Sequence, residues 1–138
     1  MTAEVAVIGS FRQHYDEVVA AVVELVESGL TVTTPPISSI TNPGELFVRF
    51  ELDPPHVSDG EIQAATLKKI LSSDAVYVVA PNGYIGRTTC YELGRVHEKG
   101  VPVFYSEVPV DLPLEVQDII VCDAVELRDR LDLEKRES

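Results

Sequence analysis

The chain has 138 residues, a length that suits one domain, 1–138, with a core of its own. Its formal net charge of −12 argues against a nucleic-acid polymer or an anionic membrane surface as partner, because both attract basic proteins. The two cysteines, Cys90 and Cys122, stand apart in apolar surroundings, which predicts reduced, buried thiols rather than a disulfide or a metal pair.

The first residues run directly into an apolar segment without a signal-peptide pattern, and no apolar run approaches membrane-spanning length. We therefore expect a cytoplasmic protein.

The first third of the chain predicts a strand–helix–strand unit. Glu4–Ile8 is an apolar strand, and Gly9–Arg12 is the turn that follows it. Tyr15–Ser28 is a helix with a broad face of valines, and Gly29 ends it. Leu30–Thr34 is the second strand, which stops at two prolines.

The middle of the chain opens with an irregular segment, in which Glu45–Leu52 could add a strand. Ser58 and Glu61 match a capping box, which predicts a helix over Asp59–Leu71. Ala75–Val79 is almost wholly apolar and rich in valine, typical of a strand buried on both faces.

A glycine-containing loop, Ala80–Arg87, leads from this strand into a helix over Thr88–Lys99. Two further strands are expected at Val101–Tyr105 and Asp118–Val121. Asp123 caps a last helix, from Ala124 to about Lys135. The alternation predicts an α/β fold, a three-layer open sheet of about five parallel strands of Rossmann or flavodoxin-like type.

Loops at the carboxyl edge of such a sheet form ligand sites. Ser10 and Arg12 follow the first strand, so we expect them over the same edge as the loop after Val79. Arg12, His14 and Arg87 would make this edge positive in an acidic chain, which favours a small anion such as a phosphate or carboxylate. Ser10 could instead be a helix N-cap, and Arg12 a solvated charge.

The loop after Val79 offers two kinds of contact to such a ligand. The backbone N–H groups of Gly83 and Gly86 are candidate donors to the anion. Tyr84 could cover a base or only pack against the protein.

Glu92 is expected in the first helical turn after this loop, facing the same edge. A carboxylate that a helix N-terminus keeps ionised could act as a nucleophile or hold a sugar hydroxyl. Two structural roles compete with this reading. Thr89 and Glu92 match a capping box, and Arg95 is spaced for an ion pair with Glu92.

Several other signatures are missing. The first loop has neither the three spaced glycines of a dinucleotide fold nor a phosphate-loop lysine. His14, His56 and His97 lack metal-ligand spacing, and Ser10 has no evident triad partners. No cofactor or metal is expected.

Three segments, in this order, resemble the nucleoside 2-deoxyribosyltransferase superfamily, which includes the 2′-deoxynucleoside 5′-phosphate N-hydrolases. Ile8–Arg12 is similar to the first-loop pattern of that family. Asp74–Val79 is similar to its central strand, and Gly86–Gly94 to the segment that carries its nucleophilic glutamate.

The resemblance implies a nucleoside or nucleotide N-glycosidase or deoxyribosyltransferase, in which Glu92 attacks the anomeric carbon as the base leaves. It implies a homodimer or a dimer of dimers as well. It also implies that the sugar and any 5′-phosphate are held by residues of two loops: Gly9, Ser10, Phe11, Arg12, Asn82, Gly83, Tyr84, Gly86, Arg87 and Thr88.

One position departs from the family pattern. The family places an aspartate eight residues before the aspartate that leads the central strand, and this chain has Thr66 there. Asp53, Asp59 and Glu61 are the candidates for the missing acid, and nothing in the sequence selects one of them. Two alternatives therefore stay open: a non-catalytic nucleotide or sugar-phosphate binding protein of the same fold, and a different α/β enzyme in which Glu92 only caps a helix.

Overall fold

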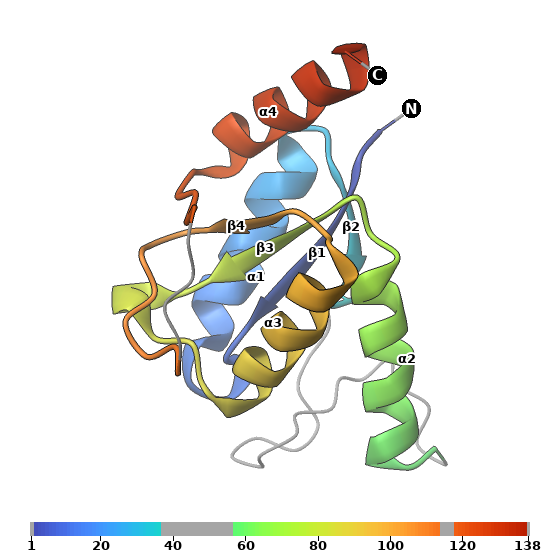
Figure 1. Ribbon diagram of the computed structural model, residues 1–138, viewed down its shortest axis with the longest axis vertical. Helices are drawn as coiled ribbons and strands as arrows, with labels where there is room; N and C mark the ends of the chain where they lie inside the picture. Colours follow the sequence, from blue (N-terminus) through green and yellow to red (C-terminus); the bar gives the residue numbers. More distant parts are fainter. Residues whose placement is uncertain (1, 37–56, 114–117, 138) are drawn as a thin grey trace.

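The computed structural model describes residues 2–36, 57–113 and 118–137, in which four parallel strands form one open sheet with helices on both faces (Figure 1). The described elements follow one another along the chain as β1 (Glu4–Gly9), α1 (Phe11–Glu27), β2 (Thr31–Thr34), α2 (Asp59–Leu71), β3 (Ala75–Val79), η1 (Pro81–Gly83), α3 (Arg87–Lys99), β4 (Val103–Tyr105) and α4 (Ala124–Glu137). The predicted α/β fold is confirmed.

The strand order β2-β1-β3-β4 places the first strand in the middle of the sheet. β1 pairs in parallel with β3 from Val5 opposite Ala75 to Gly9 opposite Val79. The chain leaves β1 toward β2 and later returns on the other side of β1 with β3. In open α/β sheets, the crevice beyond the carboxyl ends of two such strands is the usual ligand site, and this is the flavodoxin-like arrangement.

Alternation along the central strands builds two cores, one on each face. Val5 and Val7 of β1 pack with α1 and α4, whereas Ala6 and Ile8 pack with α2 and α3. All five residues of β3 are buried, as its apolar sequence predicts for a strand covered on both sides.

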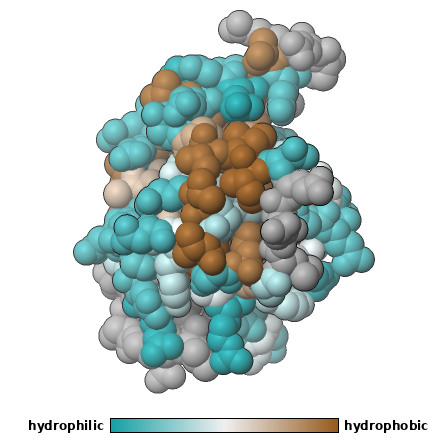
Figure 2. All heavy atoms as spheres, turned by 60° about the vertical axis from the view of Figure 1, so that its left-hand side comes forward, coloured by the Kyte–Doolittle hydropathy of each residue, from teal (hydrophilic) through white to brown (hydrophobic). Residues whose placement is uncertain are grey.

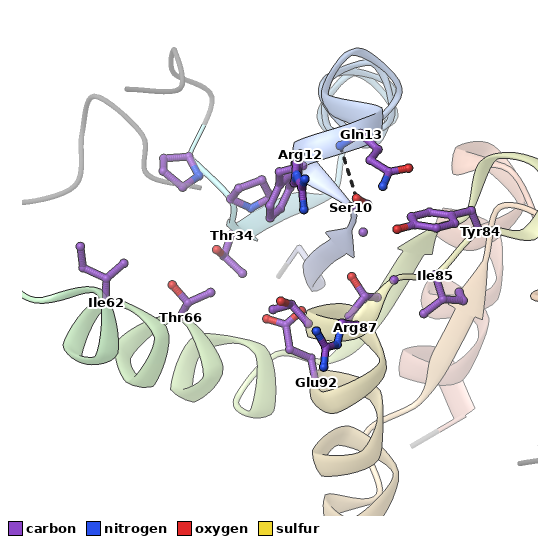
Figure 3. A pocket seen from close by; sticks show the side chains of 17 residues that line it. Ser10, Arg12, Gln13, Thr34, Ile62, Thr66, Tyr84, Ile85, Arg87 and Glu92 are labelled. Carbon is purple, nitrogen blue, oxygen red and sulfur yellow. Dashed lines mark hydrogen bonds between the residues drawn. The ribbon is translucent and has the colours of Figure 1, made fainter. Parts of the chain in front are cut away.

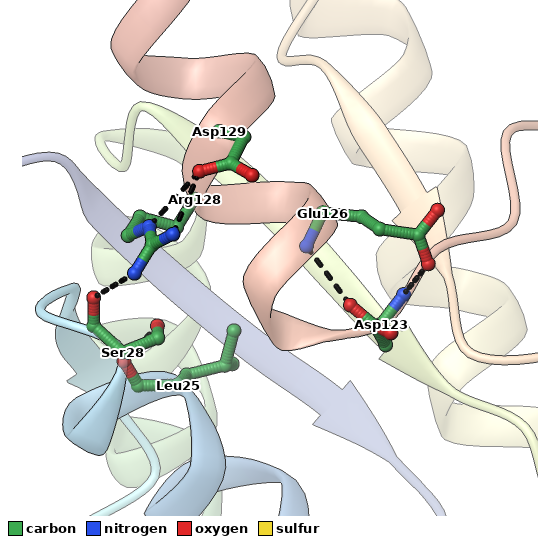
Figure 4. Close-up of polar contacts among 6 residues, drawn as sticks. All are labelled: Leu25, Ser28, Asp123, Glu126, Arg128 and Asp129. Carbon is green, nitrogen blue, oxygen red and sulfur yellow. Dashed lines mark hydrogen bonds and ion pairs between the residues drawn. The ribbon is translucent and has the colours of Figure 1, made fainter.

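The last helix is fixed to the body by side-chain contacts at its start (Figure 4). Asp123 accepts from the Glu126 N–H at 2.9 Å, and Glu126 accepts from the Asp123 N–H at 3.1 Å, which confirms Asp123 as a cap. Arg128 donates to the Ser28 carbonyl at the end of α1, over 3.4 Å. A cation at a helix C-terminus also interacts favourably with the helix dipole.

The two largest differences between the structure and the predicted elements concern the fifth strand and the first helix. The fifth strand is reduced to a single parallel bridge between Val121 and Tyr105. Helix α1 begins at Phe11 rather than Tyr15, because Ser10 acts as its N-cap and accepts from the Gln13 N–H. The possible strand at 45–52 lies outside the described residues.

Both cysteines are free; Cys122 is buried and Cys90 is partly buried. Within the described ranges, no helix has both the length and the apolarity that crossing a bilayer demands.

Candidate active site

A cavity of about 150 Å³ lies at the carboxyl ends of β1, β2 and β3 (Figure 3). Nine of the residues that the sequence singled out line it: Gly9, Ser10, Phe11, Arg12, Tyr84, Gly86, Arg87, Thr88 and Glu92. They come from two loops more than 70 positions apart, which the parallel pairing of β1 with β3 brings together. Arg12 and Arg87 are exposed, whereas Glu92 is partly buried.

Other lining residues were missed by the sequence analysis: Gln13, Thr34, Pro35, Pro36, Ile62, Ile85 and Thr89. Thr34 and the two prolines end β2, whose carboxyl end meets the same edge of the sheet, so the rule that located Ser10 would also have found them. Ile62 belongs to α2, and only tertiary packing brings it here.

Asn82 and Gly83 do not line the cavity. The Asn82 N–H donates to Glu107 Oε2 at 3.0 Å, on the segment that follows β4. Gly83 has a φ of +82° and is covered by this same segment. A Cβ atom there would lie 2.6 Å from the Val108 carbonyl oxygen. The loop after β3 thus turns one side to the cavity and the other to the segment after β4.

The backbone donors differ from those expected. The Gly83 N–H bonds to the Ala80 carbonyl at 2.8 Å, and the Gly86 N–H donates to Asp111 Oδ2 at 3.2 Å. Helix α3 starts after Gly86, and its first α-helical bond runs from the Cys90 N–H to the Gly86 carbonyl. The N–H groups of residues 87–89 therefore lack intrahelical acceptors and are the donors at this end of α3.

Glu92 does not cap the helix. The N-cap is Gly86, so Thr89 is a buried residue of the first helical turn and Glu92 lies in the second turn. The predicted capping box between Thr89 and Glu92 is therefore wrong. Arg95 donates to Tyr91 Oη at 3.0 Å and forms no ion pair with Glu92. Burial raises the pKa of Glu92 to about 7. Burial therefore opposes the ionised state that the helix N-terminus was predicted to favour, and near pH 7 the carboxyl group is only partly ionised.

Thr66 also lines the cavity, and Figure 3 shows it on α2 turned toward the same space as Glu92. Asp59 and Glu61, which could have replaced the missing acid, lie in the first turn of α2 and do not line the cavity. Asp53 lies outside the described residues. Among the described side chains that line this cavity, Glu92 is the only carboxyl group.

Tyr84 forms one wall of the cavity, with its ring centroid 5.5 Å from that of His14. His14 does not line the cavity itself, and its Nδ1 lies 3.8 Å from Glu17 Oε2. The other histidine that the structure describes, His97, is exposed on α3.

Comparisons of this chain with protein-family models, with curated proteins and with solved structures find no match.

Proposed function

We propose that this protein cleaves or transfers the N-glycosidic bond of a nucleoside or nucleoside 5′-monophosphate, with Glu92 as the nucleophile. The observation that carries the proposal is the state of Glu92. Its carboxyl group lines the cavity, and no described residue donates a hydrogen bond or an ion pair to it. A partly buried carboxyl group without a structural partner is costly to the fold, and such groups concentrate at functional sites.

The chemistry follows from the pKa of this group. Near pH 7 both forms of Glu92 are populated, and the ionised form can attack the anomeric carbon of a bound glycoside. A bond forms between a carboxylate oxygen and that carbon, while the electron pair of the glycosidic bond leaves with the base. Water, or a second base, then displaces Glu92 from the sugar. Removal of the carboxylate from water strengthens its stabilisation of the cationic sugar.

The rest of the cavity suits the two ends of such a substrate. Arg12, Arg87 and the N–H groups at the start of α3 offer positive charge and donors to a 5′-phosphate. Phe11 and Tyr84 offer aromatic faces to a sugar or a base.

A panel assay tests this proposal. The protein is incubated with nucleosides and 5′-monophosphates, and free base is measured by chromatography. Base release should increase as the pH rises through about 7, and Glu92→Gln should lower it by orders of magnitude. Glu98→Gln is the matched control, because Glu98 is exposed on the same helix and does not line the cavity. Equal activity in Glu92→Gln and Glu98→Gln would refute the nucleophile.

Thr66 favours a second candidate, a protein of the same fold that binds a nucleotide or sugar phosphate without turning it over. A threonine hydroxyl cannot readily protonate a departing base, and a positioned acid usually contributes about 10²- to 10⁴-fold. If the enzyme reading holds, native turnover is slow and Thr66→Asp raises it, since this side chain already faces the cavity. If neither native protein nor a folded, ligand-binding Thr66→Asp releases base, the binding protein is the better description.

A further inference from the structure

The segment that follows β4, residues 106–111, is hydrogen-bonded through four of its residues to the loop between β3 and α3. In Figure 1 it runs from β4 back toward η1. Its bonds to that loop join Ser106 Oγ to the Ala80 N–H at 2.8 Å, Glu107 Oε2 to the Asn82 N–H at 3.0 Å and the Val110 N–H to the Gly83 carbonyl at 2.9 Å. The glycine at position 83 permits this close approach, because a Cβ atom there would lie 2.6 Å from the Val108 carbonyl oxygen.

Asp111 makes the contact nearest to the cavity. Its Oδ1 accepts from the Ile85 N–H at 2.8 Å, and its Oδ2 accepts from the Gly86 N–H at 3.2 Å. Both residues line the cavity, and Gly86 is the N-cap of α3, whereas Asp111 itself does not line the cavity. One carboxylate thus holds two consecutive peptide groups at the point where α3 begins, and charge-assisted bonds of this kind are strong.

Gly86 offers no side chain to cap α3. The Asp111 carboxylate acts at the same end of the helix from a segment 25 residues away in the sequence. It also fills two N–H donors that would otherwise attract an anion. A phosphate in the cavity is therefore directed to the next N–H groups, those of residues 87–89, and to Arg12.

We propose that Asp111 is a positioning residue for this site: its carboxylate fixes the Ile85–Gly86 turn and so holds the start of α3, with Arg87, as a wall of the cavity. Its effect on turnover rests on the proposed function, whereas its effect on the wall does not.

Amide hydrogen exchange followed by NMR tests the wall directly. Asp111→Ala should speed exchange of the Ile85 and Gly86 amides by about tenfold or more, the scale of one lost hydrogen bond. Added formate should restore part of the protection, because it can occupy the vacated acceptor position. Asp111→Asn keeps one acceptor oxygen and should expose one of the two amides, which provides a second variant if Asp111→Ala folds poorly.

A second readout reports on the cavity itself. If the start of α3 loosens, water reaches Glu92, and the NMR titration midpoint of its carboxyl group should move from about 7 toward 4.5 in Asp111→Ala. Glu107→Ala is the matched control. It removes a carboxylate from the same segment, but that carboxylate accepts from the Asn82 N–H, and Asn82 does not line the cavity. It should speed exchange at Asn82 and leave the Glu92 midpoint unchanged.

Protected Ile85 and Gly86 amides in a folded Asp111→Ala protein would overturn the proposal, and so would an unchanged Glu92 midpoint. Both readouts are independent of turnover. If neither the wild-type protein nor Thr66→Asp released base, the proposed function would fail, and these readouts would still decide the role of Asp111.

Discussion

At the scale of the residue, burial disfavours the ionised form of the Glu92 carboxyl group. Burial raises its pKa from 4.5 to about 7, so between these values the folded state holds a proton that the unfolded state has released. The folded protein binds more protons over this range, and the free energy of unfolding contributed by this group falls as the pH rises. The contribution of Glu92 to the free energy of unfolding is fully present below pH 4.5 and is lost as the pH rises through 7.

Glu92→Gln should therefore stabilise the protein above pH 7 by about 1 to 2 kcal/mol and have little effect near pH 5. An amide keeps the shape of the side chain and carries no charge to be desolvated. Thermal unfolding of wild type and variant at several pH values measures the difference, with Glu98→Gln on the exposed face of α3 as control. A difference that does not change with pH would mean that the carboxyl group is solvated in the native state. A stabilised variant that has lost activity would be the expected mark of a functional site.

At the scale of the element, the contact between the segment after β4 and the loop after β3 depends on Gly83. Its φ is +82°, and a Cβ atom there would lie 2.6 Å from the Val108 carbonyl oxygen, so the position has no room for a side chain. Gly83→Ala should lower the free energy of unfolding by about 2 kcal/mol or more, because backbone strain and displacement of the segment add. Denaturant unfolding measures this.

The control for Gly83 comes from a helix. Gly94 lies in α3, has nothing within 4 Å of a Cβ position, and is exposed. Gly94→Ala should raise the free energy of unfolding by about 0.5 to 1 kcal/mol through its better helix propensity. If both substitutions had the same sign, the segment would not be clamped against Gly83 in solution.

The elements themselves were largely predictable, because alternating apolar and amphipathic segments determine a parallel sheet, and local caps such as Ser58 and Asp123 mark where helices begin. The grouping of Ser10 and Arg12 with Tyr84, Gly86 and Glu92 followed from one rule about strand ends. The hydrogen bonds of Asp111 could not be predicted from the sequence, because no local pattern links residues 25 positions apart. That contact explains why Gly86 starts α3 and why the local capping-box pattern at Thr89 and Glu92 was misleading.

At the scale of the whole molecule, an acidic surface is interrupted by an apolar one. Val108 and Val110 expose 61% and 75% of their surface, more than any other large apolar side chain that the structure describes, and Val121 exposes 43%. Figure 2 shows hydrophobic residues gathered on the face to which the segment after β4 belongs. Exposed apolar patches commonly mark interaction sites, and copies that each carry a charge of −12 repel unless they meet through an uncharged face.

We expect a homodimer that uses this face, with a mass in light scattering of twice 15.1 kDa at micromolar concentration. Val108→Glu should shift the mass to that of one chain, because a two-fold interface brings the added charge close to its own copy and to an already acidic partner. Val26→Glu is the matched control, because Val26 is half exposed on α1, on another part of the surface, and its substitution should leave the mass unchanged. A wild-type mass of one chain, or a Val108→Glu dimer, would contradict the assignment.

Because Val108 contacts the glycine that anchors the loop after β3, a dimer formed here would also press the segment holding Asp111 against the site. Dilution below the dissociation constant should then speed amide exchange at Ile85 and Gly86.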